Sequence, residues 1–359
     1  MNRRDLLGAM LGSAALAACS NLPPNRPAPT LARPRISADR ITRVLVGLRP
    51  YRPSGFVVRA EELGMKRIVH NYGHGGSGIT LSWGTAQLAV DLGFIDARQR
   101  YAVLGCGVVG LSTALLLQGR GAPVTIYAKA LPPDTTSNIA GGQWHPFGLY
   151  DSTTPEFLEQ FNRAVRIAYR TFQGMVGSRH GIKWHRNYIV DDHRRPFDPR
   201  DLSIRDALPE MALLSPGEHP FGDAYVHTYM TMMIEPYTYL RSLMDMFLLG
   251  GGRIEVREFG SREEVAALPE TVIFNCTGLG AKALFGDDEL MPVRGQLVVL
   301  LPQPELDYNI LGNGVYMFPR TDGVVLGGTF ERGNWSLDPR EETTTRILEG
   351  NARMAARIV

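Results

Sequence analysis

The chain has 359 residues, of which 44% are hydrophobic and 21% are charged. This composition predicts one large or two ordinary globular domains with a sizeable core and argues against a disordered chain. Because 38 basic residues are balanced by 36 acidic ones, the formal net charge of +2 gives no electrostatic footprint for a nucleic-acid partner. The three cysteines show neither metal-ligand spacing nor a disulfide framework, so we expect no metal site and a small-molecule partner.

Residues 1–19 have the pattern of an export signal. The paired arginines Arg3 and Arg4 precede a short apolar stretch, which ends in small residues before Cys19. These features resemble a bacterial leader of the twin-arginine type with a lipobox cysteine, and the apolar stretch is too short to span a bilayer permanently. The sequence therefore predicts export to the periplasmic side, with a lipid anchor on Cys19 as the only membrane attachment. Residues 20–40 contain several prolines and are expected to form an extended tether.

The strongest local signal is a dinucleotide-binding pattern. Residues 101–118 join a short apolar run, a glycine turn and a helical apolar pattern, and residues 123–128 form a second strand candidate. In this order of elements, glycines let the backbone approach a pyrophosphate, and the helix N-terminus offers free N–H groups. The residues expected to contact the dinucleotide at this turn are Gly105, Gly107, Val108, Val109 and Gly110.

The second strand candidate lacks the acidic residue that usually holds the adenosine ribose. Tyr127, Ala128, Lys129 and Ala130 stand at that position. Lys129 either faces a cofactor phosphate, which fits NADP or FAD with altered ribose contacts, or is a solvated loop lysine.

Helix and strand patterns alternate in the rest of the chain. Helical periodicity covers residues 156–173 and 236–249, and strand-like stretches occur at residues 224–232, 271–275, 295–301, 316–318 and 324–329. The elements predict an α/β protein with an FAD- or nicotinamide-binding Rossmann-like dinucleotide domain and an antiparallel-sheet α+β substrate domain.

Several motifs together resemble the D-amino-acid and D-aspartate oxidases, a family that uses FAD. Residues 47–53 (GLRPYRP), 70–80 (HNYGHGGSGIT) and 83–84 (WG) resemble the C-terminal signature of that family. The glycine turn, residues 135–137 and residues 141–146 are similar to its N-terminal part, and residues 275–280, 292–296, 327–330 and 334–335 to its later landmarks. The order differs, because the C-terminal signature here precedes the dinucleotide motif. This is the pattern of a circular permutation joined through residues 92–100.

The resemblance implies a division of the chain into segments. Residues 41–92 would carry the substrate arginine and the glycine loop that contacts the flavin, residues 93–150 the dinucleotide-binding core, residues 151–265 mainly the substrate domain, residues 266–290 a return to the FAD domain, and residues 291–359 the substrate domain again.

The resemblance also implies roles for individual residues. Arg49 matches the arginine that forks onto the substrate carboxylate, where a planar bidentate donor fixes direction as well as charge. Tyr316 matches a tyrosine that helps to hold the carboxylate, with a plain core tyrosine as the alternative. Gly76 lies on the loop that wraps the flavin and offers a backbone carbonyl to the substrate amine. The further implied cofactor contacts are Gly75, Gly78, Ile79, Thr80, Lys129, Thr135, Thr136, Ser137, Gly141, Gly142, Gln143, Trp144 and Gly278.

Two histidines in the glycine-rich stretch and the lid of the family also need an interpretation. His70 and His74 are interpreted as structural hydrogen-bonding residues, because hydride transfer in this family needs no side-chain base. The lid tyrosine of the family has no counterpart at residues 312–314, and Tyr308 is a candidate substitute.

The expected activity is the oxidation of D-amino acids, neutral ones first, to 2-oxo acids with ammonia and hydrogen peroxide, using oxygen as acceptor. Phe330 stands where the D-aspartate branch carries a basic residue, whereas Arg320, Arg332 and Tyr51 keep D-aspartate oxidation open. Two further hypotheses are a nicotinamide-dependent dehydrogenase and a lipoprotein that binds FAD without catalysis.

Overall fold

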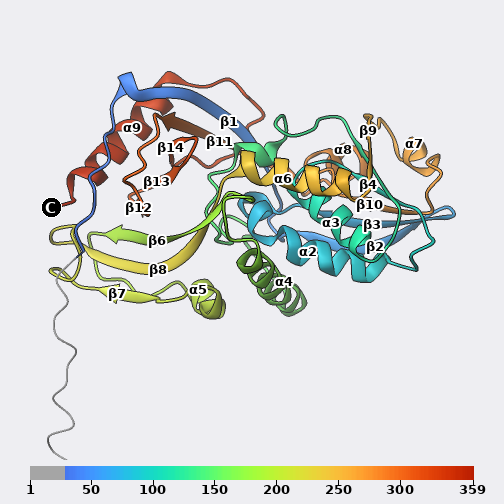
Figure 1. Ribbon diagram of the computed structural model, residues 1–359, viewed down its shortest axis with the longest axis horizontal. Coiled ribbons are helices and arrows are strands. Elements are labelled where there is room, and N and C mark those ends of the chain that lie inside the picture. Colours follow the sequence, from blue (N-terminus) through green and yellow to red (C-terminus); the bar gives the residue numbers. More distant parts are fainter. Residues whose placement is uncertain (1–28) are drawn as a thin grey trace, which may run out of the picture.

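The computed structural model describes residues 29–359. Their strands form two sheets, which lie end to end in Figure 1. The expected export signal and residues 20–28 of the expected tether lie outside the described residues. Within residues 29–359, every helix is too short or too polar to cross a bilayer.

The smaller sheet carries the dinucleotide motif. Across the sheet its strands are β2 (Val57–Leu63), β3 (Lys66–Tyr72), β10 (Val272–Asn275), β4 (Tyr101–Leu104), β5 (Val124–Ala128) and β9 (Arg253–Val256). All neighbours are parallel except the edge pair β2 and β3. Parallel strands are covered on both faces and therefore form continuous apolar runs, and all four residues of β4 are buried.

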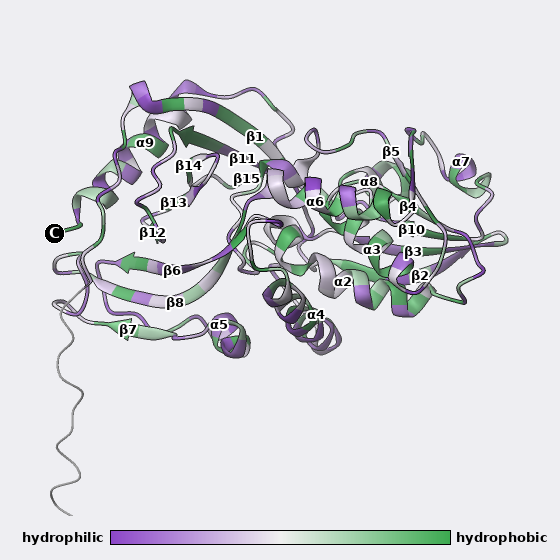
Figure 2. Cartoon of the chain, viewed as in Figure 1, coloured by the Kyte–Doolittle hydropathy of each residue, from purple (hydrophilic) through white to green (hydrophobic). Residues whose placement is uncertain are grey.

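Helices cover both faces of this sheet. One face is covered by α2 (Gly78–Gly93) and α3 (Val108–Gly119), and the other by α7 (Arg262–Ala266) and α8 (Gly280–Phe285). On the first face, α4 (Pro155–Gly174) packs on α2, and α6 (Pro236–Leu249) packs on α3. In α4 the buried residues Phe161, Val165 and Phe172 recur at helical spacing, so the outward face is polar, as Figure 2 shows. These packing partners correct the expected segment 151–265, because α4, α6, β9 and α7 belong with the dinucleotide sheet.

The larger sheet is mostly antiparallel. Its strands are, in order, β1 (Ile41–Tyr51), β11 (Met291–Leu300), β14 (Gly323–Gly327), β13 (Val315–Arg320), β12 (Tyr308–Gly312), β6 (Ile182–Asp191), β8 (Tyr225–Ile234) and β7 (Ala212–Leu214), with β15 (Glu331–Arg332) beside β11. Helix α9 (Glu341–Ala356) buries Ile347 and Met354 against this sheet. The short α5 (Pro199–Ser203) follows β6.

The segment of residues 41–92 is shared between the two sheets. β1 pairs with β11 over ten residue pairs, from Ile41 opposite Leu300 to Tyr51 opposite Met291. The chain then enters the smaller sheet through β2, β3 and α2, and residues 94–100 lead from α2 to β4. Residues 41–92 are therefore an integral part of the molecule and not a detached N-terminal domain.

The second part of the expected tether is fixed to the body of the protein, which corrects that expectation for residues 29–40. Leu31, Ala32 and Ile36 pack against the core of the larger sheet. The backbone N–H of Arg35 donates to Gln303 Oε1 at 2.7 Å. An extended chain with apolar contacts and paired backbone groups is ordered rather than a free linker.

Candidate active site

The glycine turn and the glycine-rich loop meet at the carboxyl ends of the parallel strands. Gly105 follows β4 and Gly107 precedes the first turn of α3, while η2 (Gly75–Ser77) follows β3 in the same sheet. In open parallel sheets, this edge is where ligands bind. The glycine turn and the glycine-rich loop thus lie at the same edge of the smaller sheet, although the loop here precedes the turn in the chain.

The β1 strand brings Arg49 to the same place. A Cβ added to Gly76 would lie 3.8 Å from Arg49 Cδ, and one added to Gly47 would lie 3.0 Å from Cγ2 of Ile139, in η3 (Thr136–Ile139). The expected substrate arginine, the flavin loop and the segment after β5 are therefore neighbours, as the permuted order requires.

The glycine turn fits a dinucleotide. A Cβ on Gly105 would lie 2.5 Å from the Cys276 carbonyl oxygen, and one on Gly110 would lie 2.0 Å from the Gly105 carbonyl oxygen, so this turn has no room for side chains. Gly105 also has a φ of 104°, which favours glycine. The N-terminus of α3 is half-exposed at Gly107 and Val109, where backbone amides of the first helical turn can cradle a pyrophosphate.

The segment after β5 lies against this turn. The Val108 N–H donates to Ser137 Oγ at 3.1 Å. In the same segment, Asn138 Nδ2 is buried without a hydrogen-bond partner among residues 29–359. A bound polar group would satisfy that donor, so these residues fit a cofactor that runs from the turn along η3.

The expected cofactor residues differ in accessibility. Exposed or half-exposed are Gly76, Gly78, Gly105, Gly107, Val109, Lys129, Thr135, Thr136, Ser137, Gly141, Gln143 and Gly278. Buried are Gly75, Ile79, Thr80, Val108, Gly110, Gly142 and Trp144. The Trp144 side chain packs against Tyr169 of α4, with ring centres 5.2 Å apart, and the backbone N–H of Trp144 donates to the Met232 carbonyl. The Trp144 indole therefore belongs to the core, and a cofactor contact of this residue stays a prediction.

Lys129 is paired at the surface. Its Nζ lies 3.1 Å from Glu258 Oε1, and both side chains are largely exposed. Of the two interpretations of Lys129, the structure therefore agrees with the solvated loop lysine and not with a lysine that faces a cofactor phosphate.

Arg49 and Tyr316 form the polar part of the site. Arg49 Nη1 donates to the Thr329 carbonyl at 3.2 Å. Burial raises the pKa of Tyr316, and the adjacent Arg49 charge opposes that shift. A neutral phenol beside a guanidinium can donate to the same carboxylate that the guanidinium binds.

Gly295 and Gly327, which the sequence marked only as parts of two family landmarks and not as site residues, make room for this pair. A Cβ on Gly295 would lie 2.6 Å from both Nη atoms of Arg49, and one on Gly327 would lie 2.3 Å from Tyr316 Oη. Both lie in strands of the larger sheet, where glycine weakens packing unless another group approaches closely. Glycine inside an apolar strand was the sequence signal that could have identified them.

The rings of Phe330 and Phe147 lie at the edge of the site beside Arg49, which we call its mouth. Phe330 and Phe147 stand with ring centres 6.4 Å apart, and Phe147 is 67% exposed. The Arg49 guanidinium carbon lies 5.8 Å from the Phe330 ring centre. Asp151, four residues after Phe147, holds Arg332 in an ion pair at 2.6 Å. Phe147 and Asp151 were not anticipated from the sequence.

The two histidines of the glycine-rich stretch lie in the core. His74 Nε2 is 2.9 Å from Thr85 Oγ1, and burial lowers the pKa of His74 to about 3. His70 Nδ1 accepts from the Asn275 amide at 3.0 Å. Both agree with the structural role expected for them.

Tyr308, the candidate substitute for the lid tyrosine, does not form a lid. Tyr308 is 1% exposed in β12, and its hydroxyl donates to the Ala32 carbonyl. β12 and β13 are joined by the tight turn at Asn313 and Gly314, so this hairpin carries no lid. Arg320 is also engaged, with Asp322 at 2.8 Å and the Ala140 carbonyl at 3.0 Å.

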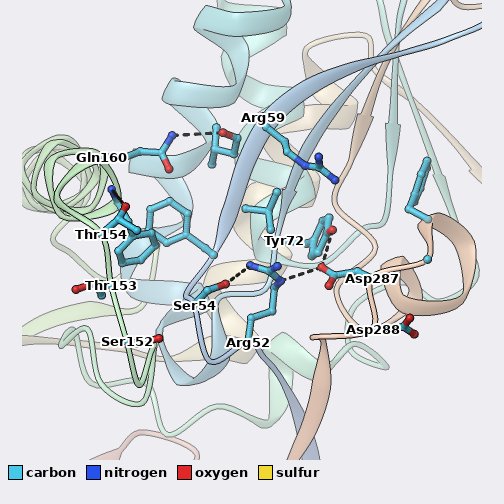
Figure 3. A pocket seen from close by; sticks show the side chains of 16 residues that line it. Arg52, Ser54, Arg59, Tyr72, Ser152, Thr153, Thr154, Gln160, Asp287 and Asp288 are labelled. Atoms are coloured by element: carbon cyan, nitrogen blue, oxygen red, sulfur yellow. Dashed lines mark hydrogen bonds and ion pairs between the residues drawn. The ribbon is translucent and has the colours of Figure 1, made fainter.

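A separate cleft of about 650 Å³ lies beside the edge strand β2 and the start of α4 (Figure 3). Arg52 points into it and pairs with Asp287 at 2.8 Å and Glu289 at 2.6 Å. Tyr72 donates to the same Asp287 carboxylate. Arg52 therefore ties the loop after β1 to the loop before β11, which distinguishes it from Arg49.

The fold and the site define a class of protein. A dinucleotide sheet with a bare glycine turn, joined to an antiparallel sheet that delivers an arginine beside a glycine loop, is the architecture of a two-domain flavin-dependent oxidoreductase. The DAO model, described as FAD dependent oxidoreductase, matches residues 25–92 and 100–358. The chain belongs to this family, and FAD is confirmed as its cofactor.

Curated relatives are similar over most of their length. The chain is 31% identical over 268 residues to a D-amino-acid oxidase of Rubrobacter xylanophilus, covering 72% of this chain and 78% of the relative. It is 32% identical over 257 residues to the human D-aspartate oxidase, covering 69% and 74%. The glycine oxidase structure from Geobacillus kaustophilus matches with a TM-score of 0.54 at 17% identity, covering 73% of this chain and 78% of that one, which shows the shared fold.

Proposed function

We propose that the protein oxidises D-amino acids to 2-oxo acids, with ammonia and hydrogen peroxide as the other products. The observation that supports this most directly is the half-exposed Arg49 beside the exposed Gly76, with Tyr316 as its neighbour. When bound at the glycine turn and the glycine-rich loop, FAD would supply the two-electron redox chemistry of this reaction, with oxygen as the electron acceptor. The D configuration rests on similarity to relatives that carry this specificity in their names.

In this proposal, the chain binds and orients the substrate. Arg49 forks onto the α-carboxylate, and its bond to the Thr329 carbonyl fixes the plane of the fork. The raised pKa keeps the Tyr316 phenol protonated, so it donates to the same carboxylate. The exposed Gly76 has a backbone that a substrate amine can approach without meeting a side chain.

The buried histidines do not serve as bases. Because the pKa of His74 is lowered to about 3, this group stays neutral and accepts protons poorly at neutral pH. Holding the substrate in a productive orientation is then the main contribution of the protein.

Anaerobic flavin reduction tests the proposal. D-alanine added to the purified holoprotein without oxygen should bleach the flavin absorbance, and L-alanine should not. Admission of oxygen should then restore the absorbance and release hydrogen peroxide. Bound flavin that no D-amino acid bleaches would instead support the catalytically degenerate FAD-binding lipoprotein.

D-aspartate oxidation is the second candidate. The observation in its favour is that Arg332 lies near the mouth, with its guanidinium carbon 5.6 Å from the Phe330 ring centre.

We further propose that the protein is exported through the twin-arginine route and anchored by a lipid on Cys19. This rests on Arg3, Arg4 and the small residues before Cys19. A cofactor inserted in the cytoplasm requires a route for folded proteins, which agrees with the paired arginines.

We propose in addition that the chain is a circular permutation of the family order. The two stretches that match the family model are separated by residues 93–99, which comprise the last residue of α2 and most of its connection to β4. A short surface connection between elements that already lie side by side can replace an old terminus without changing core contacts.

A further inference from the structure

At the mouth of the site, two cations lie near one aromatic ring. The ring centre of Phe330 lies 5.8 Å from the guanidinium carbon of Arg49 and 5.6 Å from that of Arg332. If both guanidiniums were free, they would suit a substrate with two carboxylates, one for each fork. The availability of Arg332 therefore bears directly on which side chains the site accepts.

The carboxylate of Asp151 already pairs with the Arg332 guanidinium. Asp151 Oδ2 accepts from Nη1 at 2.7 Å, and Asp151 Oδ1 accepts from Nη2 at 2.6 Å, which is the bidentate arrangement a substrate carboxylate would use. Tyr51 completes the contact, because its ring centre lies 4.9 Å from the guanidinium carbon and its hydroxyl accepts from Nη2 at 3.4 Å. The Arg332 guanidinium holds the pKa of Asp151 below its usual range, so the carboxylate remains charged at neutral pH.

We propose that Asp151 is a specificity-determining residue that excludes acidic D-amino acids by occupying Arg332. This inference rests on the proposed function and names the substrate class of the same site as neutral. A second substrate carboxylate that approached Arg332 would find both N–H donors engaged and would face the negative charge of Asp151. The exposed ring of Phe147 and the ring of Phe330 instead offer apolar surface to an uncharged side chain.

The ion pair can be removed without unfolding the site. The Arg332 and Asp151 side chains are 47% and 42% exposed, and pairs of this kind contribute at most about 1 kcal/mol to stability. The backbone of residue 151 is held separately, because its N–H donates to the Pro53 carbonyl at 2.8 Å. Asp151→Asn therefore frees the guanidinium while the segment keeps its position.

The experiment compares three variants of the holoprotein with the parent. Asp151→Asn frees Arg332, and the double variant Asp151→Asn with Arg332→Gln removes the freed cation. Asp192→Asn is the matched control, because it breaks a surface pair with Arg357 (2.7 Å) between the end of β6 and the end of α9. The readouts are kcat/KM for D-aspartate relative to D-alanine, and the Kd of succinate relative to that of butyrate from the change in flavin absorbance.

The expected result is that Asp151→Asn raises both acidic-to-neutral ratios at least about tenfold, equivalent to the roughly 1.4 kcal/mol of one added charge-assisted contact. The double variant and Asp192→Asn should match the parent. Unchanged ratios in Asp151→Asn, or a gain that persists without Arg332, would overturn the inference. If no D-amino acid reduces the flavin of the parent, the proposed function fails, and the succinate-to-butyrate ratio still decides the role of Asp151.

Discussion

The guanidinium of Arg33 donates a hydrogen bond to the main-chain carbonyl of Ile358, so the two ends of the described chain lie together. Figure 1 shows residues from 29 onward rising beside α9 before they enter β1. In the family order, the element corresponding to α9 would lead directly into β1, so this contact lies where a permutation would have cut the chain.

Restoring the family order is therefore expected to preserve the protein. A chain of residues 100–359, followed by about four Gly/Ser residues and then residues 34–93, keeps every strand and helix and only moves the break. It should bind FAD at the parent stoichiometry and unfold within a few degrees of the parent temperature. Soluble but flavin-free protein would contradict the proposed permutation.

Arg49→Met tests the carboxylate site. Loss of one partner of a charge-assisted pair in a closed site costs on the order of 2–5 kcal/mol, which corresponds to a loss in kcat/KM of roughly thirtyfold to several thousandfold. Flavin content should be unchanged. In Arg52→Met the lost bonds to Asp287 and Glu289 should instead lower stability by about 1–3 kcal/mol, with little change in substrate affinity. Equal kcat/KM in Arg49→Met and the parent would remove Arg49 from the site.

Gly295→Ala displaces the same arginine without altering its charge. The new methyl would lie 2.6 Å from both Nη atoms, so the flexible guanidinium must move. We expect kcat/KM to fall about tenfold to a hundredfold, which corresponds to roughly 1.4–2.7 kcal/mol of lost contact. Gly119→Ala, where a Cβ meets nothing within 4 Å, is the control and should retain activity. Steady-state kinetics and thermal unfolding of both variants separate misplacement of Arg49 from a general loss of stability.

Acid should destabilise the protein through His74. Burial lowers its folded pKa from 6.5 to about 3, so between these values the unfolded state binds more protons and stability falls as pH falls. At about 1.4 kcal/mol per pK unit, this group makes the protein roughly 2 kcal/mol less stable at pH 5 than at pH 7. The glutamine in His74→Gln does not titrate, so the stability of this variant should lack that part of the fall between pH 7 and pH 5. Urea unfolding of both proteins at the two pH values measures it, and equal pH dependence would show that His74 does not contribute.

Replacing Arg3 and Arg4 by lysine tests the export route. If the folded, FAD-loaded protein uses the twin-arginine pathway, the variant should remain unprocessed inside the cell with its flavin bound. Cell fractionation followed by mass spectrometry of the N-terminal peptide measures both location and lipidation at Cys19. A variant exported as efficiently as the parent would favour the general route for unfolded chains.

Much of the fold could be predicted from the sequence because its signals are local. The helix expected over residues 236–249 has those bounds in α6, and the strand expected over residues 123–128 is β5 (Val124–Ala128). Apolar periodicity and glycine at turns depend on neighbours within a few residues, so they can be read without knowledge of the fold. The α/β class and FAD followed from the glycine turn together with the family resemblance.

Only the tertiary structure decided which residues share the site and which of them are already engaged. The sequence identified Arg49, Tyr316 and Gly76 as candidate site residues. It left the roles of Lys129 and Tyr308 open, and the structure places Lys129 in a surface ion pair and Tyr308 in the core. Asp151 and Arg332 are 181 residues apart, so no local pattern pairs them. A guanidinium behaves as a free ligand site or as a neutralised pair depending on a carboxylate within about 3 Å, and that distance is set by the packing of both sheets.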